Sequence, residues 1–354
     1  MGATDLSPAL RSQVLAALEA GTALKICGGD SKHFLGRTTA GQVLSLSGHH
    51  GIVDYDPREL VLTARAGTRL SEIEETLAQA GQMLAFEPPR FGARATLGGT
   101  MACGLSGPRR PYRGAARDAI LGCRLINGRG EVLRFGGQVM KNVAGYDVSR
   151  LMVGAYGTLG ILLEISVRVW PRPTHSLTLM YECGPAEAIE RMCGLSLRPL
   201  PVDGACFHEG HCYIRVSGAQ TAVQEAHSRL GGEPLHDGAA FWEALREHRL
   251  PFFACAGPLY RIVVKPHTPP LAIAGDWLLD WGGAQRWLAS PVPASAIRRC
   301  VAQAGGHVTR WRAGADDADV FEPLTPALAR IHRRVKDGFD PGHVFNPGRT
   351  YPGL

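Results

Sequence analysis

Hydrophobic positions along the first half of the chain switch between the spacing of helices and the alternation of strands. Residues 11–20 have helical spacing that ends at Gly21. Residues 23–29 then form an apolar run that leads into a pair of glycines. This pattern predicts a short helix followed by a strand and a glycine turn.

A second strand and a second helix are predicted farther along. Residues 60–66 alternate as a strand does, and residues 70–81 carry leucine and isoleucine at helical spacing before a glycine. Ser71 is followed three residues later by Glu74, which is the spacing of a capping box. We therefore expect Ser71 to be the N-cap of this helix.

Residues 118–136 contain two apolar runs around Asn-Gly-Arg-Gly, which predicts a β-hairpin. Residues 147–171 are typical of a helix, a turn with glycines three residues apart and an alternating strand that ends at a proline. The composition changes at residues 170–176, which are rich in proline, and we place a domain boundary there.

The second half predicts a strand, a helix, two strands and a helix between residues 177 and 230, an order that resembles the ferredoxin-like split βαβ unit. Further antiparallel strands are expected at 259–266, 276–289 and 305–313, and a last helix at 325–339. The predicted class is α+β. The predicted domains are residues 1–172, residues 173–335 and a tail of residues 336–354.

Composition narrows the function classes. The chain has 354 residues, of which 45% are hydrophobic and 20% charged, with a net charge of +6, and this describes a globular protein with a sizeable core. No lysine tract interleaved with aromatic residues favours nucleic-acid binding. No secretory signal and no apolar run of about 18 residues is visible, so we expect a cytoplasmic protein.

The cysteines indicate reduced thiols. There are nine of them, and no pair has the Cys-x-x-Cys spacing. Because iron–sulfur clusters need several closely spaced thiolates, we expect this chain to carry none.

Four glycine-rich segments are the strongest candidates for a binding site. They are residues 27–36, 96–108, 154–161 and 345–349. None has the spacing of a P-loop, and the glycines of 154–161 precede a strand instead of joining a strand to a helix, which disfavours the Rossmann fingerprint.

Taken together, these segments resemble the PCMH-type FAD-binding domain of the vanillyl-alcohol oxidase-like flavoproteins. The resemblance covers roughly residues 15–172 and the terminal segment 339–349. It implies a two-part FAD domain, a smaller second domain with an antiparallel sheet, and a C-terminal tail that returns to the FAD domain. In this family a Gly-Gly loop and a Thr-hydrophobic-Gly-Gly loop surround the pyrophosphate, as anion-binding backbone nests do.

The resemblance also implies the cofactor-binding residues. In this sequence they are Gly28, Gly29, Asp30, Ser31, Lys32, Pro88, Thr96, Leu97, Gly98, Gly99, Ala102, Cys103, Gly104, Ser106, Gly107, Gly157, Gly160, Ile161 and Asn346. The glycine turn and the main chain at Ile161 would hold the adenosine end.

Within the family, residues 107–122, 141–160 and 339–353 are similar to the FAD-binding subunits of bacterial glycolate-oxidising complexes. This implies an FAD-dependent oxidoreductase subunit that acts on a small anionic 2-hydroxy acid, glycolate, with glyoxylate as product. The implied partners are a larger homologous flavin subunit and an iron–sulfur subunit, with any membrane contact peripheral and made through them. Two alternatives stay open: a self-sufficient FAD-dependent 2-hydroxyacid dehydrogenase, and a structural subunit that has lost its flavin site.

Two departures from the family pattern bear on the chemistry. Many members attach FAD covalently through a histidine directly after the first Gly-Gly, a position that Asp30 occupies here, so we expect noncovalent FAD. The histidine motif that holds a metal beside the substrate in stand-alone members is missing. The nearest candidate, with His208, Glu209 and His211, is more typical of a hairpin turn, and we predict no metal and no identified catalytic residue.

Other single residues have competing interpretations. Cys103 could face the flavin or be a small buried thiol. Arg109, Arg110 and Arg113 could be solvated, attract an anionic substrate or pair with a partner subunit. Three tryptophans, at positions 277, 281 and 287, are more typical of a core than of an electron relay.

Overall fold

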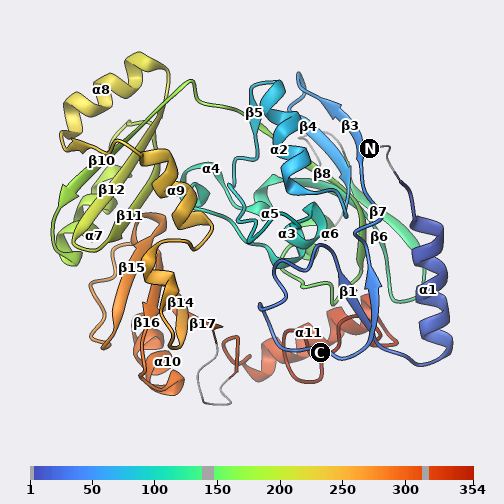
Figure 1. The fold of residues 1–354 in the computed structure, drawn as a ribbon. Helices are drawn as coiled ribbons and strands as arrows, with labels where there is room; N and C mark the ends of the chain where they lie inside the picture. The colour runs from blue at the N-terminus through green and yellow to red at the C-terminus, as the bar shows by residue number, and fades with distance from the viewer. Residues whose placement is uncertain (1–3, 138–146, 313–318) are drawn as a thin grey trace. The chain divides into compact units, whose positions relative to one another are not determined.

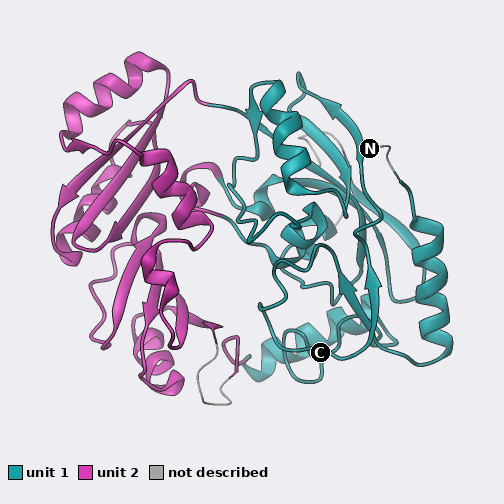
Figure 2. Ribbon diagram, viewed as in Figure 1, with its two compact units in different colours: residues 1–106, 114–172, 324–354 teal, residues 107–113, 173–323 magenta. Residues whose placement is uncertain are grey.

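The computed structural model describes residues 4–137, 147–312 and 319–354, and Figure 1 shows their ribbon. The chain forms two compact units, coloured separately in Figure 2. Unit 1 consists of residues 1–106, 114–172 and 324–354, and unit 2 consists of residues 107–113 and 173–323. Residues 141–146, part of the segment 141–160 on which the sequence resemblance rests, lie outside the described residues.

Unit 1 is built on an antiparallel five-stranded sheet with the order β3-β4-β8-β6-β7. β6 and β7 form the hairpin that the Asn-Gly-Arg-Gly sequence predicts. The central strand β8 is buried along most of its length, so both of its faces contribute to the core. The bounds of the five strands are β3 Ile52–Asp56, β4 Val61–Arg65, β6 Ile120–Ile126, β7 Val132–Gly136 and β8 Ile161–Arg168.

A second, smaller sheet of unit 1 pairs β1 (Leu24–Cys27) with β2 (Gln42–Ser45) in parallel. The C-terminal segment joins it, because Leu24 also forms a parallel bridge with Phe345. A third pair consists of β5 (Gln82–Met83) and β9 (Trp170–Pro171). The helices of unit 1 are α1 Ser7–Glu19, α2 Leu70–Gln79, α3 Leu97–Cys103, α5 Ala116–Ala119, α6 Val148–Met152 and α11 Pro326–Phe339.

The prediction of Ser71 as a helix N-cap is wrong. Helix α2 begins at Leu70, and its N-cap is Arg69. Leu70 is fully buried and its backbone N–H donates to the carbonyl of Ala95, so tertiary packing starts the helix two residues earlier than an N-cap at Ser71 would. The Glu74 carboxylate pairs with Arg90 instead, at 3.2 Å.

Unit 2 contains an eight-stranded sheet with the order β13-β10-β12-β11-β15-β16-β14-β17. The first four of these strands, with helices α7 and α8 between them, have the order expected for the ferredoxin-like unit. Three strands lie in the predicted stretches 259–266 and 276–289: β16 pairs antiparallel with β14 on one side and with β15 on the other. The bounds are β10 His175–Glu182, α7 Pro185–Leu195, β11 Val202–His208, β12 His211–Gly218, α8 Gln220–Leu230, β13 Glu233–Pro234, α9 Gly238–Arg246, β14 Leu259–Val263, β15 Asp276–Asp280, β16 Gln285–Ala289, α10 Ala294–Gln303 and β17 His307–Arg312.

The division into units differs from the predicted domains at two places. Residues 107–113, which include the short helix α4 (Arg110–Arg113), belong to unit 2 although the chain on both sides belongs to unit 1. Helix α11 belongs to unit 1, whereas the sequence places residues up to 335 with the second domain. Helical periodicity predicts the helix itself but carries no signal for the unit on which it packs.

Candidate functional site

The first glycine loop leaves strand β1 and crosses directly over the second glycine segment. A Cβ on Gly28 would lie 2.5 Å from the Thr96 hydroxyl oxygen, and one on Gly29 would lie 1.4 Å from the carbonyl oxygen of Arg94. Neither position has room for a side chain. Asp30 follows with a φ of 57°, so the chain turns sharply immediately after the crossing.

The second loop begins helix α3. The Thr96 hydroxyl is the N-cap and accepts a hydrogen bond from the Gly99 N–H at 3.3 Å. Gly98, the residue before Gly99, donates its N–H to the carbonyl of Ala66. A Cβ on Gly98 would lie 2.7 Å from the Ala66 Cβ. Gly98 therefore lets the helix pack closely, whereas at Gly99 an added Cβ would meet only the Thr96 hydroxyl, at 3.3 Å.

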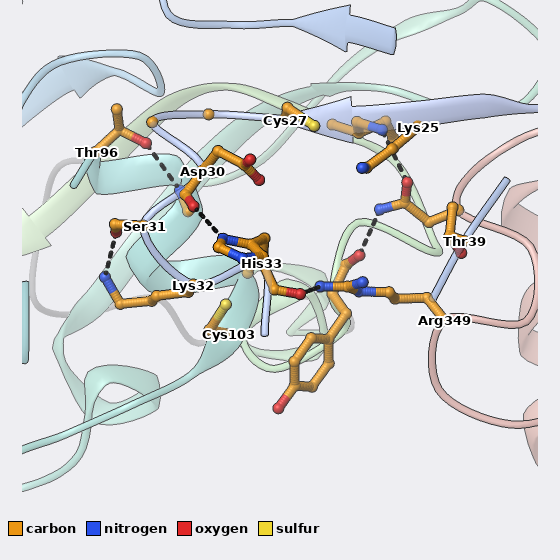
Figure 3. A pocket seen from close by; sticks show the side chains of 17 residues that line it. Lys25, Cys27, Asp30, Ser31, Lys32, His33, Thr39, Thr96, Cys103 and Arg349 are labelled. Carbon is orange, nitrogen blue, oxygen red and sulfur yellow. Dashed lines mark hydrogen bonds between the residues drawn. The ribbon is translucent and has the colours of Figure 1, made fainter. Parts of the chain in front are cut away.

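The C-terminal tail closes this site from the other side. Asn346 accepts a hydrogen bond from the N–H of Ile26 at 2.8 Å and donates from Nδ2 to the carbonyl of Tyr156 at 2.7 Å. Arg349 donates to the carbonyl oxygens of Arg37 and His33, at 2.8 and 2.9 Å. In Figure 3 the Arg349 side chain reaches toward His33 across the pocket.

These segments line a polar pocket that is open to solvent and contains about 650 Å³ of space, part of it open solvent. Three cationic side chains line it: Lys25, Lys32 and Arg349. The Lys32 ammonium is anchored at the wall, since it donates to the carbonyl of Arg90 at 3.2 Å and lies 5.8 Å from the centre of the Phe91 ring. Glycine backbone and several positive charges together form a setting suited to a diphosphate.

A second, more apolar pocket of about 530 Å³ shares several lining residues with the first, among them Gly28, Gly99 and Asn346. Its walls contain the side chains of Leu46, Ala66, Met152, Leu162 and Ala155, together with the glycines at 157 and 160. An apolar chamber beside a cationic one fits a ligand that carries an aromatic ring system next to a diphosphate.

Two cysteines line the polar pocket. Burial raises the pKa of Cys103 to about 11 and also raises the pKa of Cys27. Both thiols are therefore protonated near neutral pH and add no negative charge that would oppose an anion.

The structure brings most of the predicted site residues together. The residues that line one or both pockets are Gly28, Gly29, Asp30, Ser31, Lys32, Thr96, Gly98, Gly99, Ala102, Cys103, Gly157, Gly160 and Asn346.

The remaining predicted site residues have other positions. Leu97 and Ile161 are fully buried in the core of unit 1. Gly104 is the left-handed C-cap of α3, and the Ser106 hydroxyl accepts a hydrogen bond from the N–H of Ala116. Pro88 is buried outside the lining of both pockets, and Gly107 belongs to unit 2.

Sequence reasoning missed several lining residues: Lys25, Ile26, Cys27, His33, Thr39, Tyr156 and Arg349. Arg349 and Tyr156 lie inside two of the glycine-rich segments, so membership of these segments is a sequence signal that could identify them. Lys25 lies on strand β1, where alternation alone does not distinguish a pocket wall from a solvated edge.

The arginine run is anchored within unit 2. Arg109 Nε lies 3.1 Å from Oδ2 of Asp203, a fully buried carboxylate that also pairs with Arg215 at 2.7 Å. The Arg110 guanidinium lies 4.3 Å from the centre of the Trp281 ring. Within the described part of the chain, neither Arg109, Arg110 nor Arg113 lines the two pockets.

His208 and His211 pair across the β11–β12 hairpin, and Glu209 and Gly210 form its two-residue turn with φ angles of 46° and 75°. The prediction of a plain hairpin turn is confirmed. The residues that the structure describes contain no group of three or more histidine, cysteine or acidic side chains arranged to hold a metal ion. None of the described helices has both the length and the apolar character that crossing a membrane requires.

Comparison with known proteins agrees with this site. A family model described as an FAD binding domain matches residues 8–136. The chain is 50% identical over 350 residues to the glycolate oxidase subunit GlcE of Escherichia coli, with 99% of both chains covered. It is 31% identical over 160 residues to the glycolate oxidase subunit GlcD of Bacillus subtilis, which covers 45% of this chain and 33% of that protein.

Among solved structures, an alkyldihydroxyacetonephosphate synthase matches with a TM-score of 0.66 at 15% identity, over 96% of this chain and 74% of that one, which is a likeness of fold. The glycine crossing, the cationic pocket and the family match agree on FAD as the cofactor. The similarity to GlcE extends over the whole chain, and this chain belongs to the family of FAD-binding glycolate oxidase subunits.

Proposed function

We propose that this chain is the FAD-binding subunit of a complex that oxidises glycolate to glyoxylate and delivers the electrons to an iron–sulfur subunit. The observation that carries the proposal is the joined pair of pockets, one cationic and one apolar, built around the crossing of Gly29 and Arg94. The name of the full-length relative, a glycolate oxidase subunit, supports the substrate and the assembly.

Within the pocket, the diphosphate would lie along residues 28–32 and Gly99. The glycines of this stretch carry no side chain, and Lys32 and Arg349 supply positive charge. The adenine ring would occupy the apolar chamber beside Gly157 and Gly160. When bound, FAD supplies the redox chemistry of its isoalloxazine ring, and the protein contributes binding, orientation and electrostatics.

We propose that FAD is held without a covalent bond, because Asp30 stands where many family members have the tethering histidine. A carboxylate cannot form that histidyl link. His33 also lines the pocket, but its Nδ1 donates a hydrogen bond to the carbonyl of Asp30 at 2.9 Å, which orients the ring locally. Acid precipitation of the flavoprotein should leave the yellow flavin in the supernatant, and flavin in the washed pellet would contradict noncovalent binding.

The arginine run is proposed to act in the assembly. Arg110 is exposed, and its stacking on Trp281 fixes a positive charge at the surface of unit 2. This charge could attract an anionic 2-hydroxy acid or an acidic surface of a neighbouring subunit. Replacing Arg110 with alanine should lower the activity of the complex and leave bound FAD unchanged.

The decisive experiment compares the purified chain with a co-expressed complex. The chain alone should be yellow and show little glycolate-dependent dye reduction. Activity should appear when a larger flavin subunit and an iron–sulfur subunit are co-expressed with it. Strong glycolate turnover by the isolated chain would instead support a self-sufficient dehydrogenase, and a colourless chain that binds no added FAD would support a structural subunit.

A further inference from the structure

A lysine outside both pockets makes three hydrogen bonds that join the C-terminal tail to another segment of unit 1. Lys336 lies on helix α11, and its side chain is 2% exposed. Its ammonium donates to the Thr158 carbonyl at 2.7 Å, to Oδ2 of Asp340 at 2.7 Å and to the Phe345 carbonyl at 2.8 Å. An ammonium has three hydrogens, so these three acceptors use all of them.

The carboxylate of Asp340 organises the turn that follows α11. Asp340 is fully buried, and besides Lys336 it accepts hydrogen bonds from the N–H groups of Val344 and Phe345, at 3.2 and 2.8 Å. Gly128 packs directly against this turn, since a Cβ there would lie 2.4 Å from the Asp340 Cα. The turn is therefore held by the hydrogen bonds to the Asp340 carboxylate and by close packing against Gly128.

The segments that Lys336 joins are the same ones that deliver side chains to the pocket. Phe345 precedes Asn346, which lines both pockets, and Thr158 follows shortly after Tyr156, which lines both as well. Asn346 bonds to the Tyr156 carbonyl, and a Cβ on Gly157 would lie 2.8 Å from Asn346 Nδ2. The spacing between the two segments thus sets the position of the Asn346 amide.

We propose that Lys336 is a positioning residue for the FAD pocket. Its ammonium holds the Thr158 carbonyl and the Phe345 carbonyl at a fixed separation, and this places Asn346 between strand β1 and the Tyr156 turn. The inference rests on FAD occupying the pocket, as proposed above. Without the ammonium, the two carbonyl groups and the buried carboxylate lose a shared donor, and the tail shifts away from the cofactor.

The primary test is Lys336→Met, with the dissociation constant for FAD measured on reconstituted apoprotein. We expect FAD to bind at least tenfold more weakly, with an altered visible circular dichroism spectrum of the bound flavin. The control for general destabilisation is Asp203→Asn, which perturbs a buried ion pair in unit 2. That variant should keep its FAD affinity within about twofold of the wild-type value.

A milder variant, Lys336→Gln, keeps two N–H donors and guards against failure to fold. Hydrogen exchange should speed up in residues 156–158 and 345–346 of this variant, and the FAD affinity should fall less than in Lys336→Met. Unchanged exchange and unchanged affinity in Lys336→Gln would overturn the inference. Equal losses of FAD affinity in Lys336→Met and Asp203→Asn would overturn it as well, because affinity would then follow general stability.

The role of Lys336 and the assignment of the pocket to FAD can be tested separately. The pocket itself is tested by Gly99→Val, which fills the space beside both chambers. If Gly99→Val binds FAD normally, the pocket assignment fails and the role of Lys336 fails with it. If Gly99→Val loses FAD while both Lys336 variants bind it normally, only the role of Lys336 fails.

Discussion

Gly29 passes so close to Arg94 that a Cβ on the glycine would stand 1.4 Å from the arginine's carbonyl oxygen. Backbone thus crosses backbone beside the polar pocket, and no flexible side chain can move aside to make room. The two loops proposed to hold the diphosphate are consequently one structural unit, and a change in either loop should displace the other.

Gly29→Ala should therefore abolish FAD binding and lower the thermal stability of unit 1. The added methyl group forces the two loops apart, and this separates Gly28 from Thr96 and Gly99. Differential scanning calorimetry of the apoprotein and FAD titration measure the two effects. Gly194→Ala is the matched control, because its Cβ would meet nothing within 4 Å in helix α7, where alanine should stabilise by about 0.5–1 kcal/mol.

Gly99→Val should remove FAD binding with a much smaller effect on folding. An added Cβ at Gly99 meets only the Thr96 hydroxyl, at 3.3 Å, so the side chain projects largely into space that both chambers share. The visible absorbance of the purified variant should be lost while its far-ultraviolet circular dichroism is retained. If Gly99→Val bound FAD with the affinity of the wild-type protein, this loop would not be part of the FAD site.

Asp203→Ala should destabilise unit 2 by about 3–5 kcal/mol, since it leaves the buried guanidinium of Arg215 and the nearby Arg109 without their shared carboxylate. Chemical denaturation measures the loss. Glu187→Ala breaks the half-exposed i,i+4 pair with Arg191 and should cost only about 0–1 kcal/mol. Equal effects of the two substitutions would show that the buried cluster contributes no more than a surface pair.

Acid should weaken the fold through His248. Its ring stacks on Phe253 with centroids 4.0 Å apart, and burial, with the charges of Arg261 and Arg312, lowers its pKa from 6.5 to about 3. The unfolded state therefore binds a proton that the native state excludes. The contribution of His248 is complete above pH 6.5 and is lost as the pH falls from 6.5 toward 3, by up to ~1.4 kcal/mol per pH unit.

The variant His248→Phe keeps an aromatic ring and removes the titration. Its φ of 53° makes the substitution strained, but that cost does not depend on pH. Unfolding free energies measured between pH 7 and pH 5 should therefore fall less steeply in His248→Phe than in the wild-type protein. Parallel slopes in the two proteins would contradict the assignment to His248.

Much of the cofactor site is predictable from the sequence because it consists of glycine loops that are continuous in the chain. Gly28 and Gly99 belong to glycine motifs that can be recognised in the sequence. A ligand can approach the backbone at these positions because glycine has no side chain. Lys25 lines the pocket but belongs to no recognisable motif. The direction of its side chain depends on the register of the four-residue strand β1, which the sequence does not determine. The side chain of Ile161 packs in the core of unit 1, so only its main chain remains a candidate for contact with the cofactor.

The arginine run shows a different limit. Its composition indicates an interaction with an anion, and Arg109 does meet one, but the anion is the buried carboxylate of Asp203 in the same chain. A charge pattern cannot distinguish an internal partner from an external one, because the pairing depends on strand β11 arriving beside the loop. The same reasoning applies to helix α11. Its hydrophobic periodicity predicts a helix, but the sequence does not show on which unit that helix packs.

The polypeptide passes between the two units at residues 106/107, 113/114, 172/173 and 323/324. A fragment that ends at Arg172 would keep the glycine loops, but it would lack Asn346 and Arg349 and would expose Arg109 without its carboxylate. The pocket of unit 1 is consequently completed only when residues 346–349 are in place. During synthesis the pocket proposed for FAD cannot take its final form until residues 346–349 have been added, long after the glycine loops have left the ribosome.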